Sequence, residues 1–169
     1  MFEESRDFAA GDRFLPFDVE SARVGILTCE DAWHLTGAFL HFVRGVDVLL
    51  VPSASPARGL GGPPGSGFES TRTWDTLLRA TAMFTQTWVV HVNRVGFEDG
   101  IGFAGRTQVI DPFGETVARI EGLDEGTLEF TLTASAVHRA RVRTPLRRDE
   151  RPRIFAEELA RAIEEDATY

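Results

Sequence analysis

Hydrophobic and polar positions near the start of the chain follow a strand, helix, strand pattern. The runs at 23–28 and 47–51 are apolar almost throughout, as expected for strands covered on both faces. Between them, residues 35–43 read as a short helix that ends before Gly45. Strand, helix and strand in this order predict a βαβ unit and a layered α/β fold.

The second half of the chain predicts a longer helix and several short strands. Apolar residues at helical spacing predict a helix over 70–86, with Ser70 as a possible cap and Trp74 in the core. Residues 111–114 predict a turn, because Pro is its second residue and Gly its fourth. Apolar and polar residues alternate over 126–132, which predicts a strand with one exposed face. Further strands are predicted at 88–92, 107–110 and 116–120, and a closing amphipathic helix at 154–163.

A long segment rich in Pro, Gly and Ser follows the second strand. Its sequence over 52–67, PSASPARGLGGPPGSG, excludes a helix or a central strand. A loop of this length is either a plain connector or the rim of an active site. Its place directly after a core strand favours the rim, and both interpretations stay open.

Composition and charge narrow the class of protein. A chain of 169 residues is long enough for one sizeable core, so a single domain or a piece of one is expected. With 18 basic and 26 acidic side chains the net charge is −8, which argues against nucleic acid or an anionic membrane as partner. No apolar stretch is long enough to cross a membrane, and the acidic start is no signal peptide, so a cytoplasmic protein is expected.

The basic residues are unusual in kind. All 18 are arginines, and the chain contains no lysine. Seven of them lie in 139–153, which we interpret as a tail that crosses a surface or an oligomer partner.

Cys29, the only cysteine, is the leading candidate for chemistry. It stands where an apolar run ends and the acidic pair Glu30–Asp31 begins, whereas buried thiols that only fill space lie inside apolar runs. A strand, a sharp turn and a helix would place it at a helix entrance, where unpaired N–H groups favour a thiolate and can hold an oxyanion. A single thiol forms no internal disulfide and fits a reducing compartment. A packing role is the alternative.

The other polar residues point to no metal and no cofactor. His34, His41, His91 and His138 are scattered without the spacing of metal ligands. Arg94 and Asp111 are expected at the ends of strands, in an ion pair or a turn rather than on a substrate.

Four segments together resemble the nitrilase superfamily of carbon–nitrogen hydrolases. Each is weak alone, but they occur in the right order and cover nearly the whole chain. They are FEESRDF at 2–8 with Gly11-Asp12, RVGILTCED at 23–31, NRVG at 93–96 with FAG at 103–105 and VIDPFG at 109–114, and RTPLRRDER at 143–151.

The resemblance implies an α-β-β-α sandwich that hydrolyses amides, nitriles or N-carbamoyl compounds through a cysteine thioester. It implies Cys29 as nucleophile, the backbone N–H of Glu30 as an oxyanion donor, and Glu4 as a positioning glutamate, with Glu3 as the alternative. The Cys-Glu-Asp elbow favours amidase-like members. The resemblance also implies a small-molecule amide substrate and a homo-oligomer that pairs through 35–43 and the tail. Residues expected to line the pocket are Trp33, Ser53, Ala54 and Phe103.

This sequence departs from the family pattern in its catalytic groups. The family's lysine and first glutamate lie upstream of the segment that matches, and an arginine is no conservative replacement for that lysine. We therefore expect residues 1–169 to form one hydrolase domain that is incomplete at its N-terminus, with impaired activity when isolated. The alternative is a non-catalytic module that pairs with a complete hydrolase.

Overall fold

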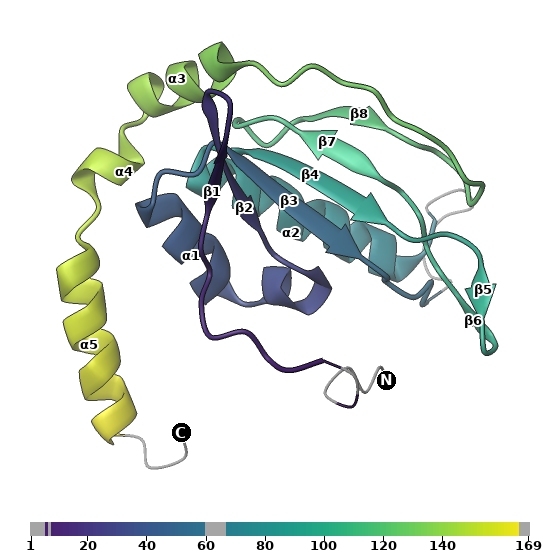
Figure 1. Cartoon of the computed structure of the whole chain (residues 1–169), viewed down its shortest axis with the longest axis horizontal. Helices are drawn as coiled ribbons and strands as arrows, with labels where there is room; N and C mark the ends of the chain where they lie inside the picture. Colours follow the sequence, from purple (N-terminus) through teal and green to yellow (C-terminus); the bar gives the residue numbers. More distant parts are fainter. Residues whose placement is uncertain (1–5, 7, 60–66, 166–169) are drawn as a thin grey trace.

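The computed structural model describes residues 6, 8–59 and 67–165, arranged around one six-stranded sheet (Figure 1). The three strands that follow one another in the middle of the sheet are parallel, and those outside them are antiparallel. The sheet order is β1 (Phe17–Val19), β2 (Ala22–Ile26), β3 (Val48–Ser53), β4 (Trp88–Asn93), β7 (Gln108–Ile110) and β8 (Thr116–Arg119), while β5 (Phe97–Glu98) and β6 (Ile101–Gly102) form a separate hairpin. The predicted α/β class is confirmed.

The helices are α1 (Leu35–Val43), α2 (Glu69–Thr85), α3 (Ala134–Arg143), α4 (Leu146–Asp149) and α5 (Pro152–Glu165). The predicted helix at 35–43 is confirmed at both ends. The prediction of Ser70 as a cap is wrong, because α2 begins at Glu69 and Phe68 holds the cap position. No helix among the described residues is long and apolar enough to span a membrane.

Helices α1 and α2 cover one face of the sheet and bury the larger core. Leu49 and Val89 of the central strands pack with Trp74 and Leu78 of α2, and each of these side chains is at most 2% exposed. Helix α1 crosses β2 where Gly25 has no side chain, since a Cβ there would lie 2.6 Å from the ring of His41. This close approach carries the chain directly from the end of β2 into the turn before α1.

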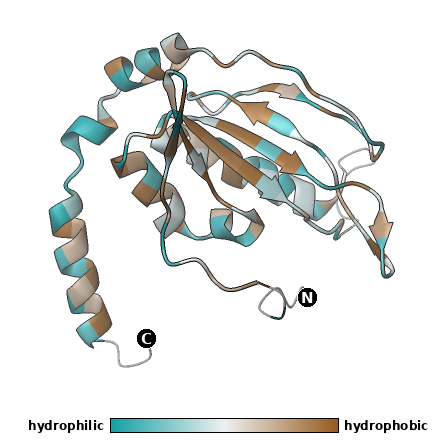
Figure 2. Ribbon diagram, in the orientation of Figure 1, coloured by the Kyte–Doolittle hydropathy of each residue, from teal (hydrophilic) through white to brown (hydrophobic). Residues whose placement is uncertain are grey.

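The opposite face of the sheet is apolar from strand to strand but only partly covered. One row across it consists of Ile26, Leu50, Val90, Val109 and Ala118, which are partners in the strand register. Figure 2 shows the strands of the sheet as mainly hydrophobic. The extended chain before α3 covers the end of this face near the start of β4.

That covering chain includes the segment 126–132, for which the prediction of a strand is wrong. The segment is extended but belongs to none of the sheets among the described residues. It runs across the sheet face instead of joining an edge, so its apolar side chains pack on Trp88, whose ring centroid lies 5.7 Å from that of Phe130. Alternation of apolar and polar residues fits both geometries, because in both one side of an extended chain is buried.

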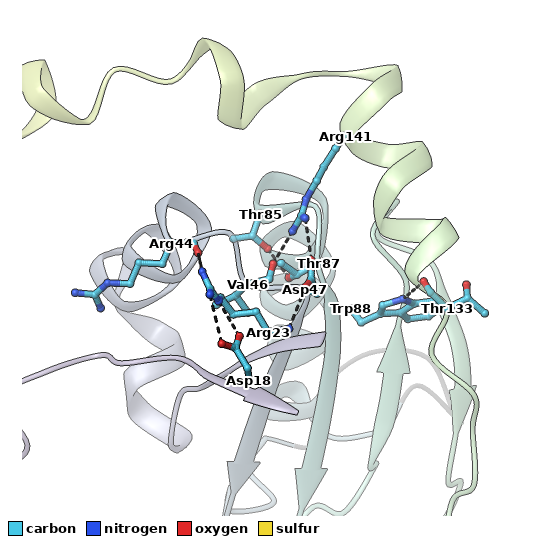
Figure 3. A network of polar contacts seen from close by, with 10 residues as sticks. All are labelled: Asp18, Arg23, Arg44, Val46, Asp47, Thr85, Thr87, Trp88, Thr133 and Arg141. Carbon is cyan, nitrogen blue, oxygen red and sulfur yellow. Dashed lines mark hydrogen bonds and ion pairs between the residues drawn. The ribbon is translucent and has the colours of Figure 1, made fainter. Parts of the chain in front are cut away.

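Polar contacts fasten α3 to the amino ends of the strands (Figure 3). Arg141 binds Asp47 at 2.8 Å and the carbonyl of Val46 at 2.7 Å. The indole N–H of Trp88 donates to the carbonyl of Thr133 at 3.0 Å. Arg141 of the arginine-rich segment 139–153 is therefore bound to this chain's own surface. This agrees with the prediction that the segment crosses a surface, which was one of two alternatives.

Candidate active site

Cys29 lies at the carboxyl end of β2 and is the first residue of a 3₁₀ turn, Cys29–Trp33. The sequence predicted a helix entrance here, and the structure inserts this short turn between the strand and α1. The backbone of Cys29 is left-handed, with φ of 46°, which is unfavourable for a residue with a side chain. Cys29 is partly buried and packs against the larger core.

The turn is braced from within. Asp31 accepts a hydrogen bond from the backbone N–H of Thr28 at 3.0 Å, and its own N–H donates to the Thr28 carbonyl at 3.0 Å. The backbone N–H of Glu30 belongs to the first turn of the 3₁₀ helix, where the helix itself supplies no acceptor. The Glu30 side chain is exposed and points no charge into the core. A left-handed backbone at a residue with a side chain persists only when neighbouring contacts such as these hold it.

The remaining predicted pocket residues come from segments that adjoin the turn. Trp33 ends the turn, is 46% exposed, and meets Trp74 edge to face with ring centroids 5.3 Å apart. Ser53 ends β3, and its buried hydroxyl has no hydrogen-bond partner among the described residues. Ala54 follows it and is half-buried. A buried hydroxyl without a partner is available to a ligand or to water.

Phe103 lies on the far side of the loop that follows β3. It pairs with Pro56 in an isolated antiparallel bridge and is 2% exposed, with the guanidinium of Arg94 4.4 Å from its ring centroid. Phe103 therefore supports the loop from below instead of presenting its ring to solvent. Residues 52–59 of the predicted rim are described and lie against the 101–105 segment, whereas 60–66 fall outside the described residues.

Two of the other residues named from the sequence, Arg94 and Asp111, have structural contacts, and two, Glu3 and Glu4, are not described by the structure. Arg94 forms an ion pair with Glu98 at 2.6 Å, and Asp111 accepts hydrogen bonds from the backbone within its turn, as expected. Glu3 and Glu4 lie outside the described residues. Within the described part of the chain, no three His, Cys, Asp or Glu side chains gather as a metal site would require.

Sequence reasoning missed a buried polar group behind the site. Asn93 ends β4, and its amide group joins Ser55 to Gly105 through hydrogen bonds of 2.9 and 2.7 Å. The sequence signal for Asn93 was its place as the first residue of the NRVG motif. Its partners are distant in the sequence, so their spacing alone could not identify them.

His91 belongs to β4, and its ring stacks on that of Trp74 with the ring centroids 4.8 Å apart. The His91 side chain is 1% exposed. Burial lowers the pKa of His91 to about 4, against the opposing effects of the Asp75 carboxylate and the Arg106 backbone. The unfolded chain has an ordinary histidine pKa of about 6.5. Below that pH the unfolded state binds a proton that the folded state rejects, so stability falls as the pH drops from about 6.5 toward 4.

We expect His91 to cost the fold about 2 kcal/mol between pH 7 and pH 5, from the width of this window. Urea unfolding at both pH values measures the loss. In a His91→Gln variant the loss should shrink by that amount, whereas the exposed His138→Gln serves as the control and should match the parent. An equal pH dependence in the parent and the His91 variant would contradict the prediction.

Comparisons with known proteins give the chain a family context. The model of the carbon-nitrogen hydrolase family matches residues 1–142. The chain is 31% identical over 143 residues to a glutamine-dependent NAD(+) synthetase of Aquifex aeolicus, covering 84% of this chain and 24% of that protein. It is 28% identical over 150 residues to a deaminated glutathione amidase of Escherichia coli O157:H7, covering 88% of this chain and 52% of that protein.

Comparison with a solved structure supports the carbon-nitrogen hydrolase fold. The crystal structure of a carbon-nitrogen hydrolase from Helicobacter pylori G27 superposes with a TM-score of 0.80 at 25% identity, over 92% of this chain and 56% of that one. The chain thus spans about half the length of the hydrolases it matches. Its sheet with α1 and α2 corresponds to part of their fold.

Proposed function

Because this chain belongs to the carbon–nitrogen hydrolase family, we propose that it hydrolyses amide or N-carbamoyl bonds with Cys29 as the nucleophile. The observation that carries the proposal is the position of the chain's only cysteine. It lies three residues after the end of the parallel strand β2, begins a braced turn in a left-handed conformation, and is partly accessible. The amidase among the similar proteins supports an amide substrate.

The proposed reaction proceeds through a thioester. The Cys29 sulfur attacks the carbonyl carbon, and the carbonyl π electrons move to the oxygen to give a tetrahedral oxyanion. The oxyanion collapses, the carbon–nitrogen bond breaks, and ammonia or an amine leaves after it gains a proton. Water then attacks the thioester carbon, the carbon–sulfur bond breaks, and the acid and the free thiol are released. The backbone N–H of Glu30 is the proposed donor to the oxyanion.

The reaction also needs a general base and a cation near the oxyanion. Glu4 is the proposed positioning carboxylate, by resemblance. The sequence contains no lysine, and an arginine differs from lysine in shape and in its fixed charge. We therefore propose that the base and the cation come from a second layer of sheet that packs against this one.

The surface beside Cys29 supports such docking. Ile26, Pro52 and Val92 lie on the uncovered side of the sheet at the carboxyl ends of β2, β3 and β4, and we call them the open sheet face. Ile26 is 43% and Val92 53% exposed, although parallel strands are normally covered on both sides. Because Ile26 of the open sheet face lies three residues before Cys29, a layer that covers this face would reach the neighbourhood of the nucleophile.

The test is ammonia release from a panel of small amides and N-carbamoyl compounds. The chain alone is compared with the chain joined to the N-terminal half of the E. coli deaminated glutathione amidase, which supplies the family's glutamate and lysine by resemblance. We expect release only from the joined protein. Equal release by the chain alone would show that the lysine is dispensable, and silence in both would overturn the proposed hydrolase.

A second candidate function is a non-catalytic module that pairs with a complete hydrolase. The absence of lysine from the sequence and the open sheet face favour it. The same assay separates the two, because a non-catalytic module would show no gain in ammonia release when it is joined to the N-terminal half.

We also propose that the chain pairs with a second copy of itself through helical surfaces. An apolar groove of about 1000 Å³ runs between α1, α2 and the start of α5, lined by Leu35, Phe39, Leu77, Phe84 and Phe155. Helix α5 itself has no buried residue, and it projects from the body of the protein (Figure 1). A 14-residue helix is marginal by itself in water, so its apolar stripe needs a partner surface.

A second copy supplies the matching surface. The stripe of α5, with Ile154, Leu159 and Ile163 each at least 46% exposed, complements the groove of another chain. The acidic residues Glu157 and Glu164 of α5 complement the arginines of α4 beside the groove. A two-fold axis would satisfy both stripes and both grooves at once.

We expect Leu159→Glu to convert a dimer into a monomer in sedimentation equilibrium. The reason is that the carboxylate would be buried without a partner in the apolar groove. Val142→Glu is the control, because Val142 is 66% exposed on α3 and lies outside the groove. A monomeric parent, or a dimer that survives the Leu159 change, would overturn this interface.

A further inference from the structure

Trp74 connects three elements that surround the nucleophile turn. It is 2% exposed in the middle of α2. Its indole N–H donates to the hydroxyl of Ser55 at 2.8 Å, its face stacks on His91 at 4.8 Å, and it meets Trp33 edge to face at 5.3 Å. Trp33 belongs to the same 3₁₀ turn as Cys29. One side chain thus touches the turn, the loop after β3 and the strand β4.

Ser55 extends this connection into the second loop of the site. Its backbone N–H donates to the side-chain carbonyl of Asn93 at 2.9 Å, and its carbonyl accepts from Ala104 at 3.0 Å. Asn93 in turn donates to the carbonyl of Gly105 at 2.7 Å. Ser55 and Asn93 are 6% and 7% exposed, so a lost partner here could not be replaced readily by water.

The indole N–H of Trp74 makes a hydrogen bond that packing of the ring alone does not require. An apolar ring of similar size would fill the core, but a buried indole N–H requires an acceptor, and that acceptor fixes the rotation of the ring. The rotation sets the face that Trp33 contacts. Cys29 lies four residues before Trp33 in the same turn, and its left-handed backbone depends on its surroundings to persist.

We infer that Ser55 and Trp74 are positioning residues that hold the Cys29 turn in its reactive geometry through Trp33. The inference rests on the proposed function of Cys29, and it extends that function to two residues that touch neither the thiol's substrate nor the reacting atoms. Ser55 fixes Trp74, Trp74 fixes Trp33, and Trp33 restrains the turn. Loss of the Ser55 hydroxyl frees the indole to rotate and loosens the nucleophile.

The test measures alkylation of Cys29 by iodoacetamide at neutral pH, in the folded chain and in the same chain unfolded in urea. As the only cysteine, Cys29 accounts for all the reaction at thiols. We expect the folded parent to react faster than the unfolded chain. Ser55→Ala should lower the folded rate roughly three- to tenfold, the effect of one hydrogen bond. Trp74→Phe should lower it at least as much, because it removes the same hydrogen bond and also shortens the ring that contacts Trp33 and His91. Since both changes remove the Ser55–Trp74 hydrogen bond, the double variant should resemble Trp74→Phe alone.

Two further variants separate positioning from general stability. Thr85→Val also removes one buried hydroxyl, which donates to Thr81 at 2.7 Å from a residue 6% exposed at the other end of the sheet. Its alkylation rate should equal that of the parent, and Ser55→Thr, which keeps the acceptor, should restore the parent rate. An unchanged rate in Ser55→Ala, or an equal fall in Thr85→Val, overturns the positioning role. A folded parent no faster than the unfolded chain overturns instead the proposed function of Cys29.

Discussion

Replacement of Cys29 by alanine is expected to remove ammonia release from the joined protein described above, by a factor of about 10³ or more. No other side chain of this chain can form the thioester, because only a thiol can do so and Cys29 is its only cysteine. Without the sulfur, the oxyanion donor has no covalent intermediate to stabilise, so the remaining groups offer little catalysis. The measurement is ammonia release at saturating amide.

The fold of this variant should stay intact, which makes the result interpretable. Cys29 is only partly buried, and its left-handed backbone is set by the turn and by Thr28 and Asp31 rather than by the thiol. Urea unfolding should therefore differ from the parent by less than about 1 kcal/mol, as for a partly exposed substitution. Activity in Cys29→Ala equal to that of the parent would contradict the nucleophile assignment.

The parts of the fold that the sequence predicted are those fixed by local patterning. Helix α1 was predicted at both ends, because its apolar spacing is bounded by the Cys29–Trp33 turn and by Gly45. The turn at 111–114 was predicted for a similar reason, since turns favour Pro at the second position and Gly at the fourth. The N–H of Gly114 donates to the carbonyl of Asp111 at 2.9 Å, and Gly114 has φ of 85°. In both cases the determining residues are neighbours in the sequence.

The parts that the sequence did not predict depend on distant contacts. Residues 126–132 were assigned to a strand, because alternation cannot show whether an extended chain pairs with an edge or crosses a face. The candidate site repeats this division. Cys29 stood out from its position in one short segment, whereas the link from Ser55 to Asn93 joins residues 38 positions apart. Only the register of β3 against β4 brings those two residues together.

The second large effect that we expect is a loss of binding at the open sheet face. We expect the double change Ile26→Asp and Val92→Asp to weaken binding of a separately supplied N-terminal half-domain by roughly 100-fold or more, because two carboxylates would be buried without partners. Ammonia release should fall in parallel when that half-domain is limiting. Isothermal titration calorimetry measures the first quantity, and the amide assay the second.

This change should leave the isolated chain folded, because both side chains are already about half exposed to water. Val142→Asp, at a position 66% exposed on α3, is the matched control and should bind the half-domain like the parent. If the double variant binds as tightly as the parent, the sheet layer docks elsewhere. If it binds weakly but the parent releases no ammonia, the open sheet face serves the non-catalytic module. A fall in both quantities joins the two proposals, since the surface that completes the fold is then also the surface that completes the site of Cys29.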